Sequence, residues 1–168
     1  MLDQRQFQEW SRKLNLTAQA ESLIQQVRFS APSRRVQGRR GNVSGRYPSR
    51  KMGVTIQFES HRNELAAIYE LEHDPTVIEL YDQPPAIKLS WWITAGRRVG
   101  IWHTPDYFVI RTDSAGYEEC KDEGELRQLA DRNPQRYRRD ETGCWYCPPG
   151  EEHAEGFGLY YRLRSSGE

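Results

Sequence analysis

Apolar residues recur at helical spacing in two segments near the start of the chain. This pattern predicts helices over residues 3–14 and 17–28, with Asp3 and Thr17 as their N-caps. The expected inward positions are Phe7, Trp10, Leu14, Ala20, Leu23, Ile24 and Val27. We interpret residues 1–30 as an N-terminal helical arm. Two roles stay open for it, namely packing against a partner and completing the domain.

The next segment has no apolar periodicity. Residues 31–53 are rich in Gly, Ser and Arg, and we expect a loop there. Alternation over residues 54–58 predicts a short strand. Ser60 suits the N-cap of a helix that continues to about residue 72. Leu65, Ile68 and Tyr69 are expected on the inner face of that helix.

Strand patterns dominate the second half of the chain. We expect strands over residues 76–83, 86–93, 98–110, 117–121 and 156–164, with a break near Pro105 in the third, and a helix over residues 123–132. The stretch DSAG at residues 113–116 has the length of a hairpin turn. This order predicts a mixed α/β domain with a central sheet flanked by helices, which would occupy residues 54–168.

Charge is distributed unevenly, although the formal net charge is zero. Residues 22–58 contain no Asp or Glu, and most of the acidic residues follow them. This asymmetry suggests contact with nucleic acid, and the alternative is a solvated linker. The candidate phosphate-binding residues are Arg34, Arg35, Arg39, Arg40, Arg46, Arg50 and Lys51.

The sequence predicts no signal peptide, and no stretch approaches the ~20 apolar residues of a membrane span. Three cysteines do not suit a secreted disulfide framework, so we expect a cytoplasmic protein. Cys144, Cys147 and His153 supply only part of the usual four zinc ligands. Reduced structural cysteines and a zinc site therefore both stay open, and the first is favoured.

Candidate chemistry lies on the predicted hairpin. Asp106 shares a face with Phe108 and Ile110, and Glu119 shares a face with Lys121, because side chains alternate along a strand. Pairing across the turn would bring Asp106, Glu119 and Lys121 together. Two carboxylates and the Cys120 carbonyl are oxygen ligands that suit Mg²⁺ or Mn²⁺. Glu64, in the first turn of the preceding helix, is a candidate third carboxylate.

The ordered set of Glu64, Thr-Pro-Asp ending at Asp106, and Glu-Cys-Lys at residues 119–121 resembles the PD-(D/E)XK nuclease superfamily. Within it, residues 60–85 followed by HTPDYFV, with Gln83–Pro84 after a strand, resemble TnsA-type transposon-end endonucleases. The resemblance covers roughly residues 34–164.

This resemblance implies a restriction-endonuclease-like core with Glu64, Asp106, Glu119 and Lys121 as catalytic residues. It implies Mg²⁺-dependent hydrolysis of the non-transferred strand at the 5′ ends of a transposon, in a bacterial, nucleoid-associated setting. A DDE transposase of the TnsB type, separate or fused after residue 168, would cut and join the other strand, and a TnsC-like ATPase is a further possible partner.

Two other functions stay open from the residues alone. One is a stand-alone nuclease of defence or repair, and the other is a DNA-binding or assembly module without catalysis. His103, Trp91 and Trp92 have two possible roles, namely contact with DNA and packing, and packing is favoured.

Overall fold

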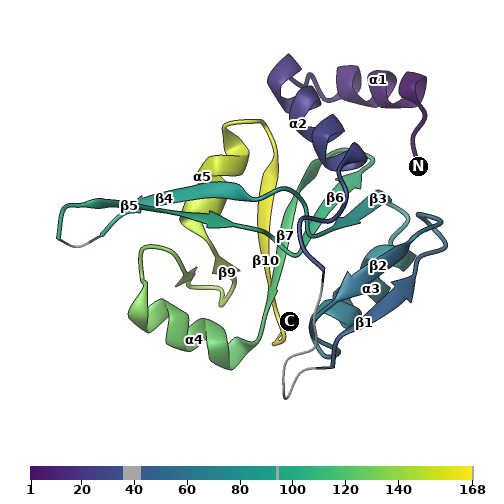
Figure 1. Cartoon of the computed structure of the whole chain (residues 1–168). Helices are drawn as coiled ribbons and strands as arrows, with labels where there is room; N and C mark the ends of the chain where they lie inside the picture. Colours follow the sequence, from purple (N-terminus) through teal and green to yellow (C-terminus); the bar gives the residue numbers. More distant parts are fainter. Residues whose placement is uncertain (36–42, 94, 168) are drawn as a thin grey trace.

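The computed structural model describes residues 1–35, 43–93 and 95–167. Within these residues the helices are α1 Gln4–Lys13, α2 Ala18–Phe29, α3 Glu64–His73, α4 Glu123–Arg132 and α5 Pro148–Glu155. The strands are β1 Gly45–Pro48, β2 Thr55–Phe58, β3 Val77–Asp82, β4 Ile87–Trp92, β5 Arg98–His103, β6 Tyr107–Arg111, β7 Ala115–Lys121, β8 Arg138–Arg139, β9 Trp145–Tyr146 and β10 Tyr160–Ser165. The predicted mixed α/β class is confirmed (Figure 1).

A four-stranded mixed sheet forms the centre, in the order β10-β7-β6-β3. β6 and β7 are an antiparallel hairpin, as the sequence predicted, and β3 pairs antiparallel to β6. β10 runs parallel to β7 and pairs with it from Tyr160 to Ser165. A parallel neighbour needs a crossover connection, which the chain between β7 and β10 supplies with α4 and α5.

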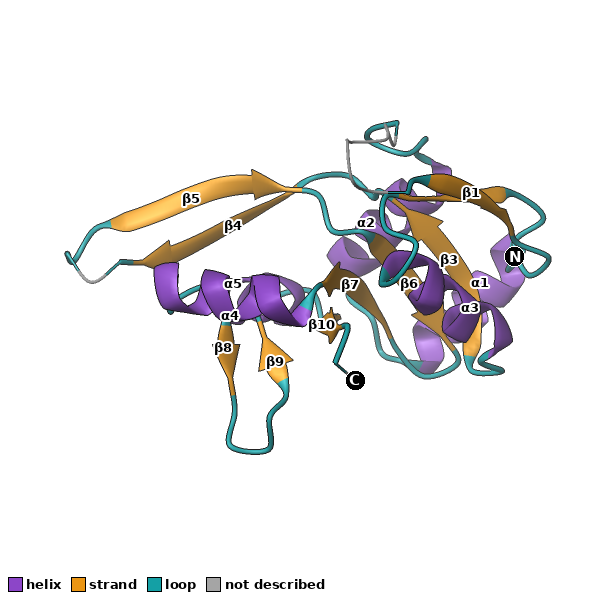
Figure 2. Ribbon diagram, turned by 90° about the horizontal axis from the view of Figure 1, so that it is seen from below, coloured by secondary structure: helices purple, strands orange, loops and turns teal. Residues whose placement is uncertain are grey.

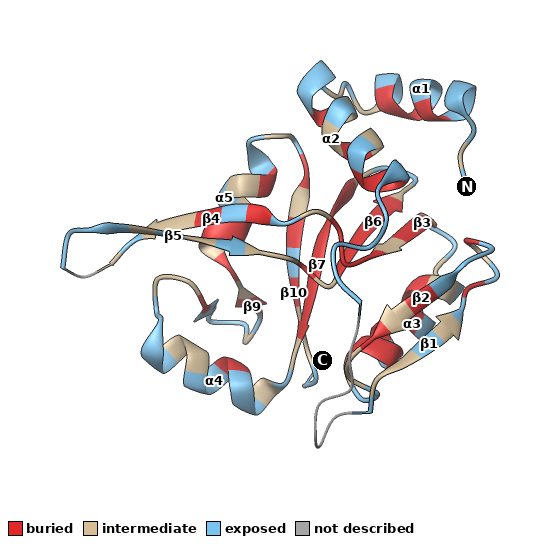
Figure 3. Cartoon of the chain, in the orientation of Figure 1, coloured by how far each residue is buried: buried red, intermediate tan, exposed pale blue. Residues whose placement is uncertain are grey.

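The two faces of this sheet carry separate hydrophobic clusters, since side chains alternate along each strand. Phe108 and Ile110 pack in one cluster, beneath α1, α2, α5 and β4. Tyr107 and Val109 pack in the other, beneath α3 and the β1–β2 hairpin. Burial of both faces explains why β6 and β7 are almost continuously buried (Figure 3).

The N-terminal helices begin where the sequence predicted. Asp3 closes a capping box with Gln6, and the Thr17 hydroxyl accepts a hydrogen bond from the Ala20 N–H. Trp10 packs in the same hydrophobic cluster as Phe108 and Ile110, and its indole N–H donates to the Arg111 carbonyl at 2.7 Å. Of the two roles considered, this packing favours completion of the domain.

Three local expectations were wrong. Residues 45–48, expected as loop, form β1, because they pair in register with β2. α3 begins at Glu64, and its N-cap is Asn63 rather than Ser60. The Ser60 hydroxyl instead accepts a hydrogen bond from the Asn63 N–H, in the turn that precedes the helix. Tyr69, expected inward on α3, is 50% exposed.

The expected long strand over residues 98–110 is divided at Pro105, as predicted, and its halves join different sheets. β5 pairs only with β4, and this two-stranded ribbon extends away from the central sheet (Figure 2). The small β8–β9 hairpin and α5 were not expected from the sequence. No helix among the described residues is long and apolar enough to cross a membrane.

Candidate active site

The proposed catalytic residues lie where β6 begins and β7 ends. The last backbone pair of this hairpin joins Tyr107 to Glu118, so Asp106 and residues 119–121 lie just beyond the β6–β7 pairing, while residues 119–121 still pair with β10 on their other side. The Asp106 carboxylate accepts a hydrogen bond from the Cys120 N–H at 2.8 Å. The N–H and C=O of one strand residue point to the same side, so the Cys120 carbonyl also faces the Asp106 side.

Glu64 reaches the same place from the first turn of α3. Its carboxylate accepts from the Glu59 N–H at 2.7 Å and is buried. Glu64, Asp106 and Lys121 line one open pocket of about 880 Å³. The structure therefore brings together three of the four predicted catalytic side chains around one solvent-accessible space.

Glu119 lies behind this pocket and is fully enclosed by partners. The Tyr161 hydroxyl donates to its Oε2 at 2.5 Å, and the Lys121 ammonium lies 2.9 Å from its Oε1. His103 Nε2 lies 3.4 Å from Oε2. The Tyr137 hydroxyl donates to Oε1 at 3.5 Å. These partners fix the orientation of Glu119, and none of them lies near it in sequence except Lys121.

The electrostatics differ sharply between the carboxylates. Burial, followed by the charges of Glu64 and Glu119, raises the pKa of Asp106 to about 7. Burial also raises the pKa of Glu64, which shares this region with Asp106. Burial would raise the pKa of Glu119 too, but His103 and Lys121 together hold it well below its usual range.

Lys121 is held as a cation. Burial alone would lower its pKa, but the nearby charge of Glu119 raises it well above the usual lysine value. At neutral pH the Lys121 ammonium is therefore suited to stabilising negative charge at the pocket. It is poorly suited to accepting a proton while the contact with Glu119 persists.

A buried glutamine connects this pocket to the basic segment. Gln83 has a positive φ of 46°, which is uncommon for a residue other than glycine. Its N–H donates to the Asp106 carbonyl at 2.9 Å, and its carbonyl accepts from the Ser33 N–H at 2.8 Å. Its side chain accepts from Arg34, which also lines the pocket. In the sequence, only the family resemblance points to Gln83.

The predicted DNA-binding residues fall into different environments. Arg34 lines the pocket, whereas Arg35, Arg46 and Arg50 are exposed elsewhere on the segment. The Lys51 ammonium instead donates to the carbonyls of Leu71, Asp74 and Val77, which gives it a structural role at the end of α3. Arg39 and Arg40 lie outside the described residues.

The remaining candidates are separate from the pocket. Cys147 is buried, Cys144 is exposed, and burial raises the pKa of Cys147 to about 12. Across residues 1–35, 43–93 and 95–167, no three or more His, Cys, Asp and Glu side chains gather to hold a metal ion. A site with two carboxylates, one carbonyl and waters would not need such a group.

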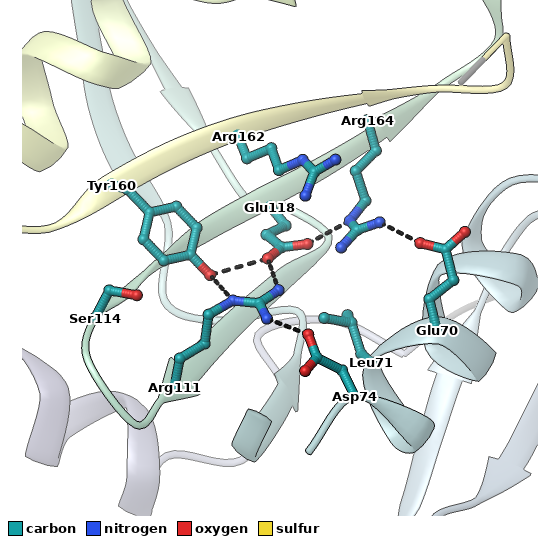
Figure 4. A pocket seen from close by; sticks show the side chains of 9 residues that line it. All are labelled: Glu70, Leu71, Asp74, Arg111, Ser114, Glu118, Tyr160, Arg162 and Arg164. Atoms are coloured by element: carbon teal, nitrogen blue, oxygen red, sulfur yellow. Dashed lines mark hydrogen bonds and ion pairs between the residues drawn. The ribbon is translucent and has the colours of Figure 1, made fainter. Parts of the chain in front are cut away.

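A second cluster of charges lies on the opposite side of β7. Glu118 is fully buried and binds Arg111, Tyr160 and Arg164 (Figure 4). Arg111 continues to Asp74, and Arg164 to Glu70, so this network joins β6, β7 and β10 to α3. Each acidic group meets a cation here, which marks the cluster as structural.

Comparison with known families adds no further assignment: no protein-family model matches the chain, and no curated protein matches it. The residues and their geometry therefore carry the functional argument.

Proposed function

We propose that this chain is a metal-dependent DNA endonuclease with a PD-(D/E)XK core of the TnsA type. It would hydrolyse the non-transferred strand at the 5′ ends of a transposon, together with a TnsB-like transposase. The observation that carries the proposal is the convergence of Glu64, Asp106 and Lys121 on one pocket, with Glu119 paired to Lys121. The mixed sheet with flanking helices is compatible with that core.

The donor set fits a hard divalent cation. Asp106 and Glu64 each use one carboxylate oxygen to accept a backbone N–H, and no described residue binds the other oxygen. Asp106 and the Cys120 carbonyl are the proposed ligands of Mg²⁺ or Mn²⁺, with Glu64 as an additional one. Glu119, which the sequence also predicted as a ligand, has both oxygens bound by Tyr161, His103, Lys121 and Tyr137, so its proposed task is to hold Lys121 at the pocket. The bound ion would neutralise phosphate charge and lower the pKa of a coordinated water.

The protein groups have separate tasks in this proposal. Asp106 must lose its proton before it binds a cation, so its raised pKa sets the pH at which the site becomes competent. Protonated Lys121 stabilises negative charge that develops on the phosphate. Arg34, held by Gln83 at the edge of the pocket, contacts a DNA phosphate.

The partners follow from the sequence resemblance. A TnsB-like transposase would act on the transferred strand, and a TnsC-like ATPase would regulate the assembly. Double-stranded DNA at the transposon ends is the proposed substrate.

The first test combines metal binding with cleavage. Mn²⁺ is titrated calorimetrically into the wild type, Asp106→Asn, and the control Asp113→Asn, which changes an exposed carboxylate in the hairpin turn. The same proteins are incubated with supercoiled plasmid and Mg²⁺ or Mn²⁺. We expect the wild type and the control to bind the metal, and to nick DNA once a TnsB-like transposase is added, whereas Asp106→Asn should lose both.

A wild type that binds no metal, with or without DNA, would contradict the nuclease proposal and favour a non-catalytic module. Cleavage of plasmids without any transposase would favour the stand-alone nuclease. Cleavage that begins only when a TnsB-like transposase is added would support the transposon-end function.

A further inference from the structure

The β4–β5 ribbon has one face packed on the protein and one face open to solvent. Along β5 the residues alternate between exposed and half-buried, and β4 shows the matching pattern over its first residues. On the packed face, Ile87 and Leu89 belong to the hydrophobic cluster that contains Phe108. His103, at the base of the ribbon, contacts the Tyr161 hydroxyl at 3.1 Å. The ribbon is therefore anchored beside the side chains that hold Glu119.

The open face displays two tryptophans. Trp102 is 73% exposed and Trp92 is 64% exposed, although large aromatic side chains bury most of their surface in typical cores. Residues directly opposite in an antiparallel pair share a face. Trp92 pairs with Arg98 and Trp102 pairs with Lys88, so each tryptophan has a cation beside it.

Small residues separate the two aromatic rings. Ser90 pairs with Gly100 between them, and the two tryptophans are four register positions apart, which corresponds to about 13 Å along the ribbon. The Arg98 guanidinium donates to the Ser90 hydroxyl at 2.8 Å, which holds that cation along the open face. The face thus offers two accessible ring surfaces with positive charge next to each.

The ribbon's own sequence is basic. Residues 83–105 include Lys88, Arg97, Arg98 and His103 but no Asp or Glu, and the acid Glu152 of α5 lines a pocket with Trp92 and Arg98 at one end of the ribbon. This surface therefore favours a ligand that combines negative charge with flat apolar surfaces at intervals. A DNA strand with unpaired bases has these properties, because every base has a face for stacking and each linkage carries a charge. In a paired duplex the base faces are already covered by their neighbours.

We propose that the open face of the β4–β5 ribbon binds an unpaired DNA strand, with bases stacked on Trp92 and Trp102 and phosphates held by Lys88 and Arg98. This inference rests on the proposed nuclease function, and it adds the form of DNA that the enzyme holds next to its cutting site. The ribbon projects away from the central sheet, and its base at His103 is three residues before Asp106 (Figures 1 and 2). Trp102 lies near that base and Trp92 at the far end, so a bound strand would run outward along the ribbon from the side of the pocket.

The test measures fluorescence anisotropy of a labelled oligothymidylate and of a labelled blunt duplex. The proteins are the wild type, Trp92→Ala, Trp102→Ala, the double variant, and Phe29→Ala, which removes a 75% exposed aromatic side chain from α2. Each tryptophan variant should bind the single strand about tenfold more weakly, and the double variant more weakly still. Phe29→Ala should bind as the wild type does.

Salt dependence separates the two kinds of contact. Lys88→Ala and Arg98→Ala should each lower the slope of log affinity against log salt for the single strand, because they remove phosphate contacts. The tryptophan variants should keep the wild-type slope. Unchanged affinity in the double variant, an equal loss in Phe29→Ala, or an equal loss for the blunt duplex would overturn the proposal.

The experiments distinguish failure of the ribbon proposal from failure of the nuclease proposal. Asp106→Asn should still bind oligothymidylate while it loses cleavage. Tryptophan-dependent binding by a protein that never cuts DNA would uphold the ribbon proposal and reject the nuclease. Normal cleavage with no single-strand binding by the wild type would reject the ribbon proposal alone.

Discussion

At the scale of single residues, sequence spacing predicted that Asp106 and Glu119 lie near each other, but not which side chains hold them. Asp106 and Glu119 could be placed together because β6 and β7 form a hairpin with a short turn. Tyr161 and His103, which fix Glu119, arrive from β10 and β5. No local pattern links these segments, since their proximity depends on the whole sheet. The opposite pKa shifts of Asp106 and Glu119 could not be predicted from the sequence for the same reason.

Metal affinity should depend on pH through Asp106. Its pKa of about 7 means that the carboxyl is protonated below neutrality, and a cation must displace that proton. We expect Mn²⁺ affinity to rise by up to about tenfold per pH unit from pH 5.5 to 7 and to level off above about pH 7.5. Calorimetry in buffers of different ionisation enthalpy would also detect proton release near pH 6. A pH-independent affinity would contradict the assignment of Asp106.

Ionisation of Asp106 should also lower the free energy of unfolding at and above neutral pH. Its folded pKa lies above the ordinary value of 3.8, so its stabilising contribution is complete below about pH 4 and is lost as the pH rises through about 7. Asp106→Asn keeps a neutral group there, and we expect it to increase the free energy of unfolding by about 2 kcal/mol at pH 8 without metal. The gain should vanish near pH 4.

Urea denaturation at both pH values would measure this difference, with Asp113→Asn as the control for an exposed carboxylate. A loss of stability in Asp106→Asn at pH 8 would show that the charged carboxylate is stabilising, contrary to this argument.

At the scale of elements, periodicity and caps located most helices and strands. Asp3 and Thr17 capped α1 and α2 as expected, and Pro105 divided the long strand. β1 was missed because its residues read as loop, and pairing with β2 alone makes it a strand. α5 was missed because its sequence, PPGEEHAE, has little apolar periodicity, although Pro at its first positions is compatible with a helix start.

The Glu118 network should stabilise the contact of α3 with the sheet. Glu118→Gln would leave Arg111 and Arg164 without their buried carboxylate, and we expect a loss of about 3 kcal/mol in the free energy of unfolding. The control is Glu70→Gln, whose side chain is 69% exposed while it pairs with Arg164, so a loss under about 1 kcal/mol is expected. Urea denaturation measures the stability of both variants. Equal losses of stability would show that burial of the Glu118 ion pairs is unimportant.

At the scale of the whole molecule, a buried ion pair joins the N-terminal helices to the sheet. Arg28 on α2 binds both carboxylate oxygens of Glu79 on β3, at 2.9 and 3.0 Å, and Arg28 also donates to the Leu2 carbonyl. The Leu2 N–H donates to Glu79 in return. Apolar periodicity predicted amphipathic helices here, but the partner of Arg28 lies 51 positions away and no sequence pattern indicated it.

Arg28→Ala should therefore loosen the whole N-terminal region. Glu79 is fully buried and would lose its cation, at an expected cost of about 3–5 kcal/mol in the free energy of unfolding. Limited proteolysis should then cut within residues 1–30 faster than in the wild type. Arg12→Ala, which changes an exposed arginine on the same arm, should leave both measurements nearly unchanged. Equal protease resistance in the two variants would show that apolar packing alone holds the helices.

The parallel strand β10 also has a consequence for biosynthesis. Tyr161 orients Glu119 and Arg164 neutralises Glu118, yet both residues follow their partners by more than 40 positions. A chain emerging from the ribosome makes β6 and β7 well before β10. The nascent protein consequently lacks the partners of Glu118 and Glu119 until the ribosome has released β10. Under the proposed function, DNA cleavage would therefore start only after β10 has been synthesised.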